Sequence, residues 1–187
     1  AMLPLEGKAL CLVVKGDELS GLYYGTPGEA LSSAADLSNQ VHVRYTDRAY
    51  HTVLSCAPQM YDELWVGAKC MYKLEPAVAD GGQLIIYAPH IHDVAVVHDR
   101  VIREVGYHTR DYYLAQWDRF KDYPWGILAH STHVKGIGTY EDGVEKPRIE
   151  VVLATGIPEE KCCEINLGYM DPGSIDVNEY MDQEEEG

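Results

Sequence analysis

Two segments of the chain each contain an uninterrupted apolar run: residues 83–88 (QLIIYA) and 148–155 (RIEVVLAT). A strand that is apolar on both faces has to be covered on both faces, which is the usual condition of strands in a parallel sheet. Residues 8–15 (KALCLVVK) show the same pattern and are bounded by charge and by Gly16. We therefore expect all three segments to be buried strands.

Helical signals separate these strands. Thr26 suits the N-cap of a helix and Pro27 its first residue. The Gly81-Gly82 pair is expected to end a second helix, because glycine favours the C-terminal cap. We expect helices at about residues 27–38, 61–80, 98–105 and 110–120, with a short helix after Pro158. We expect further strands at residues 41–46, 51–57 and 125–132. The segment 20–31 is expected to be a loop that leads into the first helix. Alternating strands and helices predict an α/β fold: a mostly parallel sheet with helices on both faces, in a single domain.

The chain has 187 residues, of which 46% are hydrophobic, and this is enough for one packed core. We expect one domain over residues 1–170, followed by an acidic tail over residues 171–187. The tail contains acidic residues and no Lys or Arg. We expect it to be ordered only in contact with a further part of the protein.

Charge and composition narrow the range of partners. The formal net charge is -15, which argues against a nucleic-acid-binding protein and against binding to an anionic membrane. No apolar run is long enough for a membrane span, and no signal peptide is recognisable, so we expect a cytoplasmic protein. The 5 cysteines include no Cys-x-x-Cys pair. We interpret them as reduced thiols and expect no structural zinc.

Histidines follow two of the predicted strands. His90 and His92 come after residues 83–88, and His130 and His133 come after the apolar residues 126–129 (GILA) of the segment 125–132. The carboxyl ends of parallel strands meet at one edge of a sheet, where α/β proteins bind ligands. These four imidazoles could form a metal site there. The alternative is that they are polar loop residues that hydrogen-bond to the strand ends.

Lys69 lies on the predicted helix 61–80, between Trp65 and Tyr72 on a neighbouring face. A lysine in a helix is usually solvated. A lysine flanked by aromatic rings in a partly desolvated pocket would instead bind a small carboxylate firmly.

The segment LWVGAKCM…VADGGQLIIYAPHI resembles the C-terminal domain of the nickel-pincer lactate racemase family. That family has a helix with the core Tyr-Gln-x-x-Lys-Gly-Met, then a Gly-Gly turn and an apolar strand. Lys69 and Met71 match this core, whereas Trp65, Val66 and Cys70 replace its tyrosine, glutamine and glycine. The family's lysine holds the substrate carboxylate, and the resemblance gives this role to Lys69.

A second segment, DYYLAQW, is similar to the family's Asp-x-Trp-Gln-x-Gln stretch. Asp111 and Gln116 match it, and Tyr113 falls where the family has a pocket tryptophan. The resemblance thus implies a substrate-binding set of Lys69, Trp65 and Tyr113, with no catalytic residue in this chain. Because Val66 replaces a glutamine that contacts substrate, it also implies a 2-hydroxy acid other than lactate.

Members of this family are racemases or epimerases with two domains. The resemblance implies that an N-terminal domain, outside this chain, binds the nickel-pincer nucleotide and carries the histidines that ligate nickel and move protons. Racemisation would proceed by transfer of hydride from carbon 2 to the cofactor and back on the opposite face. This chain would supply the carboxylate clamp and a wall of the pocket. It would hold no cofactor and be inactive alone.

Two other hypotheses stay open at this point. One is a freestanding metal-dependent enzyme that uses the four histidines. The other is a non-catalytic domain that covers or assembles a partner. The aromatic composition, 14 Tyr and 3 Trp against 1 Phe, suits a surface that meets another domain, because Tyr and Trp are amphipathic.

Overall fold

The computed structural model describes residues 7–181 of the chain. The chain forms two compact units, one up to Asp47 and one from Arg48 onward. The sequence had led us to expect one domain over residues 1–170. Each unit is described by itself. No helix in the described part of the chain combines the length and the apolar character that are needed to cross a bilayer.

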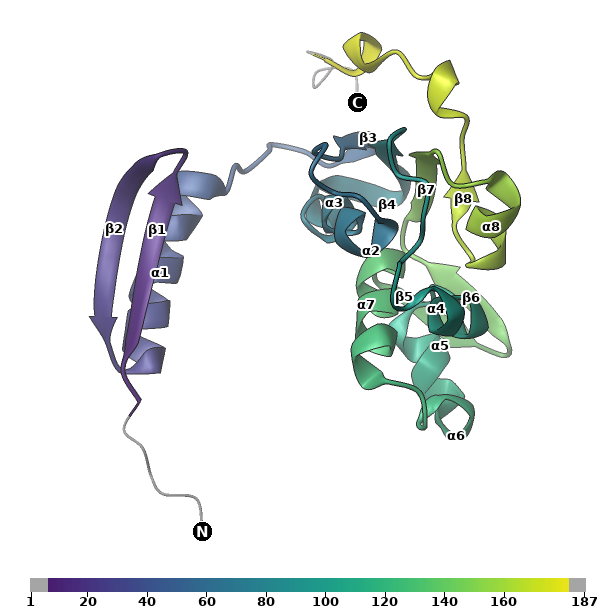
Figure 1. Cartoon of the computed structure of the whole chain (residues 1–187), viewed down its shortest axis with the longest axis horizontal. Coiled ribbons are helices and arrows are strands. Elements are labelled where there is room, and N and C mark those ends of the chain that lie inside the picture. The colour runs from purple at the N-terminus through teal and green to yellow at the C-terminus, as the bar shows by residue number, and fades with distance from the viewer. Residues whose placement is uncertain (1–6, 182–187) are drawn as a thin grey trace. The chain divides into compact units, whose positions relative to one another are not determined.

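The first unit is an antiparallel hairpin packed on one helix (Figure 1). Strands β1 (Ala9–Lys15) and β2 (Glu18–Gly25) pair with each other, and α1 (Pro27–His42) follows. The Thr26 hydroxyl accepts a hydrogen bond from the Glu29 amide at 3.4 Å, so the predicted cap of this helix is confirmed. The prediction of a loop at residues 20–25 was wrong, as was the strand at 41–46, where α1 ends and coil follows.

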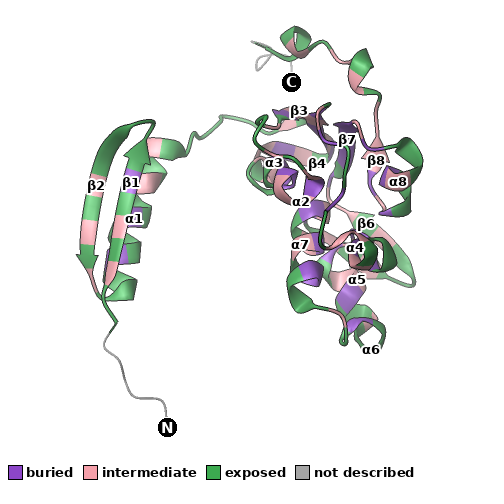
Figure 2. Ribbon diagram, viewed as in Figure 1, coloured by how far each residue is buried: buried purple, intermediate pink, exposed green. Residues whose placement is uncertain are grey.

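The strand predicted at residues 8–15 exists, but it does not belong to the parallel sheet and is not buried on both faces. One face of β1 is the more buried, with Val13 only 4% exposed. The alternate residues Leu10, Leu12 and Val14 are 50–57% exposed. Pairing in a two-stranded hairpin with one helix leaves the second face uncovered within this unit, and Figure 2 shows the hairpin largely exposed.

The second unit is built on a parallel sheet of four strands. Their spatial order is β3 (Tyr50–Cys56), β4 (Val78–Ala88), β7 (Glu150–Thr155) and β8 (Gly168–Tyr169), and every neighbouring pair is parallel. This confirms the predicted α/β class and the strands predicted at 51–57, 83–88 and 148–155. The central strands β4 and β7 are the most buried (Figure 2), as their continuous apolar sequences require.

The two faces of the sheet carry unequal cores. On the larger side, Leu84, Ile86 and Leu153 pack in one cluster with buried residues of the surrounding helices, such as Leu64 and Val134. On the other side Ile85, Val152 and Ala154 form a small cluster, against which partly buried Met170 and Ile175 of the C-terminal segment pack. The larger cluster fixes the positions of the helices that carry the candidate site.

The helix predicted over residues 61–80 is much shorter than expected. It consists of α2 (Leu64–Gly67) and α3 (Lys69–Tyr72), followed by the 3-10 helix η1 (Glu75–Ala77). Strand β4 then begins at Val78 and includes the Gly81-Gly82 pair, so the interpretation of this pair as a helix cap was wrong.

The Gly81-Gly82 pair instead forms an irregularity in β4. Tyr50 pairs with Val78 and Thr52 with Gln83, so β4 uses extra residues at this point. Gly81 has a φ of 77°, and a Cβ on Gly82 would lie 2.4 Å from the backbone oxygen of His51. Glycine is therefore required here by the close approach of two strands.

Helices and a second hairpin connect β4 to β7. These elements are α4 (Asp99–Val105), α5 (Arg110–Ala115), α6 (Trp117–Phe120), α7 (Trp125–Lys135), β5 (Gly138–Glu141) and β6 (Val144–Pro147). The helices predicted at 98–105 and 110–120 are confirmed. The strand predicted at 125–132 was wrong, because this segment is α7. Its buried residues Ile127, Leu128, Ser131 and Val134 recur at helical spacing.

After β7, helix α8 (Glu159–Glu164) begins just after Pro158, as predicted. Residues 171–181, which belong to the predicted acidic tail, contain the 3-10 helices η2 (Pro172–Ser174) and η3 (Val177–Tyr180). Ile175 packs against the smaller core cluster. The remainder of the predicted tail, residues 182–187, lies outside the described residues.

Candidate functional site

The carboxyl edge of the parallel sheet is held together by two histidines. The His90 Nε2 atom lies 3.0 Å from the backbone oxygen of Tyr61, and its Nδ1 atom lies 3.3 Å from the side-chain nitrogen of Gln59. The His92 Nδ1 atom lies 3.2 Å from the backbone oxygen of Gly156. These contacts link the loop after β4 to the loops after β3 and β7. They correspond to the alternative that the sequence left open, hydrogen bonding at strand ends.

His130 and His133 do not join this edge as residues of a strand end, because both belong to helix α7. The His130 Nε2 atom lies 3.0 Å from the Trp65 backbone oxygen, and the two rings stack with their centroids 3.8 Å apart. Burial lowers the pKa of His130, although its hydrogen bond to Trp65 opposes this effect. Within residues 7–181 no group of three or more His, Cys, Asp or Glu is placed to hold a metal ion. The predicted four-histidine site is thus not formed.

A groove opens beside the carboxyl end of β3, between this strand and α3. Its volume is about 230 Å³, and its lining residues are Ser55, Cys56, Pro58, Tyr61, Lys69, Cys70, Lys73 and Leu74. Lys69 is exposed, and its ammonium nitrogen lies 5.3 Å from the centroid of the Tyr61 ring. This distance is within the range of a cation–π interaction. The groove has the size and the charge to bind a small anion.

The position of Lys69 follows from the way in which α2 and α3 dock. The amides of Leu64 and Trp65 donate hydrogen bonds to the backbone oxygens of Asp93 and Val94, both at 2.9 Å. The helix pair is therefore fixed to the segment that follows β4. Buried Leu64 and Met71 are fully packed in the core. Since those side chains point inward, Lys69 is left on the outer side of the helix pair, facing the groove.

Trp65 does not line the groove with Lys69, although the sequence predicted one shared face. The indole of Trp65 is half-buried between the rings of His98 and His130, with centroid distances of 4.5 Å and 3.8 Å. Tyr72 lies with its ring centroid 5.9 Å from that of His133. The rings of Trp65 in α2 and Tyr72 in α3 thus both contact histidines of α7. Only Lys69 of the three reaches the groove.

Tyr113 is a core residue in the structure and is not part of any pocket lining described here. Only 3% of it is exposed. Its hydroxyl donates to the backbone oxygen of Gly106 at 2.6 Å and lies 2.5 Å from the Ser131 hydroxyl. Burial raises the pKa of Tyr113, and its hydrogen bond to Ser131 opposes this. Its hydrogen-bonding capacity is used inside the fold, so the structure gives it no contact with a ligand in the groove.

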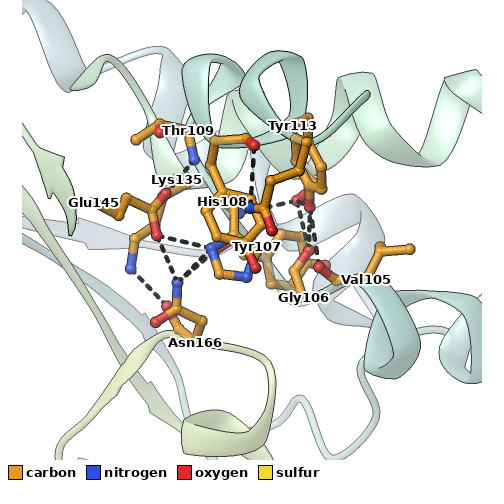
Figure 3. Close-up of polar contacts among 12 residues, drawn as sticks. Val105, Gly106, Tyr107, His108, Thr109, Tyr113, Lys135, Glu145 and Asn166 are labelled. Atoms are coloured by element: carbon orange, nitrogen blue, oxygen red, sulfur yellow. Dashed lines mark hydrogen bonds and ion pairs between the residues drawn. The ribbon is translucent and has the colours of Figure 1, made fainter. Parts of the chain in front are cut away.

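A polar network that the sequence did not reveal is centred on Glu145, His108 and Asn166 (Figure 3). The carboxylate of Glu145 accepts a hydrogen bond from the Thr109 amide at 2.6 Å and contacts His108 Nδ1 at 2.7 Å. The Asn166 amide nitrogen donates to the Tyr107 backbone oxygen at 2.9 Å. Burial tends to raise the pKa of Glu145, but the bonds from His108 and Thr109 outweigh it and hold this pKa below its ordinary value. The network ties β6 to the loop before α5.

A second hollow lies between α3, α5 and the end of α7. Its volume is about 450 Å³, and its lining residues are Tyr72, Glu75, Arg110, Asp111, Thr132, His133, Gly136, Ile137 and Gly138. Its charges have partners within the fold: Arg110 forms an ion pair with Asp111 at 3.1 Å, and the Glu75 carboxylate contacts Arg148 at 3.9 Å and accepts a hydrogen bond from the Ile137 amide at 2.8 Å. This hollow is therefore less suited to bind an anion than the groove that contains Lys69.

Comparison with solved structures supports the fold. A crystal structure of a protein from Thermotoga maritima matches with a TM-score of 0.80 and 36% sequence identity, over 94% of this chain and 44% of that one. The lactate racemase apoprotein from Thermoanaerobacterium thermosaccharolyticum matches with a TM-score of 0.63 and 14% identity, over 96% of this chain and 41% of that one.

No protein-family model and no curated protein sequence matches the chain. The chain spans less than half the length of each of the two structures. It thus has the fold of a part of lactate racemase.

Proposed function

We propose that this chain is the substrate-binding domain of a racemase or epimerase that acts on a small 2-hydroxy acid, with Lys69 as the clamp for the substrate carboxylate. The observation that carries the proposal is the position of Lys69 in a groove at the carboxyl edge of a parallel sheet. This is the edge at which open α/β sheets bind ligands. The structural likeness to lactate racemase supports the same reading.

The groove suits a carboxylate for electrostatic reasons. Within residues 7–181 Lys69 forms no ion pair, so its charge is available to a ligand. The Tyr61 ring beside it holds the ammonium by a cation–π contact. A hydrogen bond between an ammonium and a carboxylate is roughly twice as strong as one between neutral groups. Lys69 would thus fix one end of the acid and leave the carbon that bears the hydroxyl group free to face a second domain.

We further propose that the nickel-pincer nucleotide of such an enzyme is bound by other residues of the full-length protein. The described residues do not fit it, because none of their His, Cys, Asp and Glu side chains form a metal-ligating group of three or more. We therefore assign no metal-bound step to this chain. It binds and orients the acid, and orientation of a substrate can lower a reaction barrier by several kcal/mol.

The experiment that tests this proposal is a calorimetric titration of the chain with lactate and other small 2-hydroxy acids. In Lys69→Met the affinity should fall about tenfold or more, because one charge-assisted hydrogen bond is lost. Lys15→Met is the matched control, since it removes an exposed ammonium from β1 and should leave the affinity unchanged. The chain alone should racemise none of these acids.

In a protein that joins this chain to the proposed N-terminal domain, Lys69→Met should raise the KM for the acid. Lys69→Arg should restore part of the loss, because it keeps a cation at the same place. Equal affinity in wild type, Lys69→Met and the control would remove the assignment of Lys69.

A further inference from the structure

A second lysine lines the same groove as Lys69. Lys73 follows it by four residues, is the C-cap residue of α3, and is exposed. Residues four apart on a helix are neighbours, with Cβ atoms about 5–6 Å apart. Both lysines line one concave surface of about 230 Å³.

The two charges are not compensated by the protein around them. The groove is lined by Ser55, Cys56, Pro58, Tyr61, Lys69, Cys70, Lys73 and Leu74, so no Asp or Glu is among its described lining residues. Neither lysine forms an ion pair within residues 7–181. Like charges four residues apart on a helix repel each other. An anion between them would remove this repulsion.

The positive charge of this groove contrasts with the acidic character of the whole chain. Acidic residues outnumber Lys and Arg by 30 to 15, and several cations are paired with carboxylates. Arg103, for example, contacts Glu164 at 3.0 Å, and Lys161 contacts Asp99 at 3.0 Å. A groove with two cations and no lining carboxylate is a local positive surface on a strongly acidic protein, and such a concave surface concentrates anions.

We infer that the acid bound in this groove carries a second negative group, held by Lys73, so that the substrate class is a 2-hydroxy acid with an additional carboxylate or phosphate. This inference rests on the proposed function and narrows its substrate. Lys69 holds the carboxylate next to the hydroxyl-bearing carbon, and Lys73 holds the other anionic end.

The test compares three probes by calorimetric titration at constant ionic strength. Lactate has one carboxylate, malate has two, and 3-phosphoglycerate has a carboxylate and a phosphate. At least one of malate and 3-phosphoglycerate should bind about tenfold more tightly than lactate, the effect of one further charge-assisted contact. Whichever of the two binds more tightly identifies the second group as carboxylate or phosphate.

The variants Lys73→Met, Lys73→Arg and Lys15→Met assign the effect to Lys73. In Lys73→Met the tighter-binding of malate and 3-phosphoglycerate should lose its advantage of about tenfold, while the affinity for lactate stays within about twofold of wild type. Lys73→Arg should keep the advantage because it keeps the charge. Lys15→Met, in which an exposed ammonium of β1 is removed, should behave as wild type.

Three results would overturn the inference, and only one of them would also overturn the proposed function. If lactate binds in a manner that depends on Lys69 but neither malate nor 3-phosphoglycerate binds more tightly, the inference fails and the proposed function stands. If none of the three probes binds in a manner that depends on Lys69, both fail. An equal loss of lactate and malate affinity in Lys73→Met would also reject the assigned role, since it would show a general effect on the groove.

Discussion

The ammonium nitrogen of Lys69 lies 5.3 Å from the centroid of the Tyr61 ring, across the groove at the end of β3. This contact places the cation without neutralising it, so the charge stays available to a ligand. A carboxylate in place of Tyr61 would have held the lysine equally well and would have blocked its use as a clamp.

The Tyr61 contact leads to a first prediction. In Tyr61→Leu the affinity for small 2-hydroxy acids should fall by about two- to fivefold, because a cation–π contact at an exposed site contributes about 0.5–1 kcal/mol. Tyr61→Phe is the matched control and should bind as wild type, since it keeps the ring. Calorimetric titration of both variants measures the effect. A loss of the same size in Tyr61→Phe would show that the hydroxyl, and not the ring, matters.

A second prediction concerns stability in mild acid. The folded state lowers the pKa of His130 from 6.5, first because the ring is buried. Below this ordinary value the unfolded chain takes up a proton that the folded chain resists, so the free energy of unfolding should decrease as the pH falls from about 6.5 through the lowered pKa. Above pH 6.5 this contribution is complete.

The control for this effect is His130→Phe, which keeps an aromatic ring against Trp65. It should be destabilised at neutral pH through the lost hydrogen bond, but its urea unfolding should depend less on pH between about 7 and 5. If the two proteins show the same pH dependence in this range, His130 does not contribute to it.

A third prediction concerns the network of Glu145. Its folded pKa lies below the ordinary 4.5, since bonds from His108 and Thr109 outweigh the effect of burial. The stability it provides should be present above pH 4.5 and be lost as the pH falls below that value through the lowered pKa. Glu145→Gln should lower the free energy of unfolding by about 1–3 kcal/mol at neutral pH. Below pH 4.5 the stability of this variant should depend less on pH than that of wild type. An unfolding curve identical to wild type would contradict the network.

A fourth prediction tests the irregularity in β4. A Cβ on Gly82 would lie 2.4 Å from the His51 backbone oxygen, which cannot move like a side chain. Gly82→Ala should therefore lower the free energy of unfolding by about 1–3 kcal/mol. Gly126→Ala is the control, because nothing lies within 4 Å of its added Cβ in α7. It should stabilise the protein by about 0.5–1 kcal/mol. Chemical denaturation compares the two variants.

The sequence predicted those parts of the fold in which the residue pattern of a segment agrees with the way in which the segment packs in the structure. Strands β4 and β7 are apolar on both faces and lie in the middle of the sheet, as expected. The segment 125–132 was misread as a strand, since a short apolar run does not distinguish a strand from a buried helix. The Gly81-Gly82 pair was misread because glycine serves both helix caps and strand bulges, and only the neighbouring strand decides between them.

The candidate site was predictable only in part. Lys69 was identified from its flanking aromatic residues and from a resemblance, and the structure places it in a groove. Trp65 and Tyr113 were assigned to the same pocket, yet one packs on His130 and the other is buried at 3% exposure. Which side of a helix faces the core depends on contacts made by distant segments. The spacing of Lys69 and Lys73 could have been noticed in the sequence, but their shared groove could not.

The most direct test of the central claim is an NMR titration of the labelled chain with malate, with chemical-shift changes mapped onto the structure. The account predicts that the largest changes occur at Cys56, Tyr61, Lys69 and Lys73, which line one groove, and that they disappear in Lys69→Met. Changes centred on Tyr72, Arg110 and His133, which line the second hollow, would contradict it, as would the same changes in wild type and Lys69→Met.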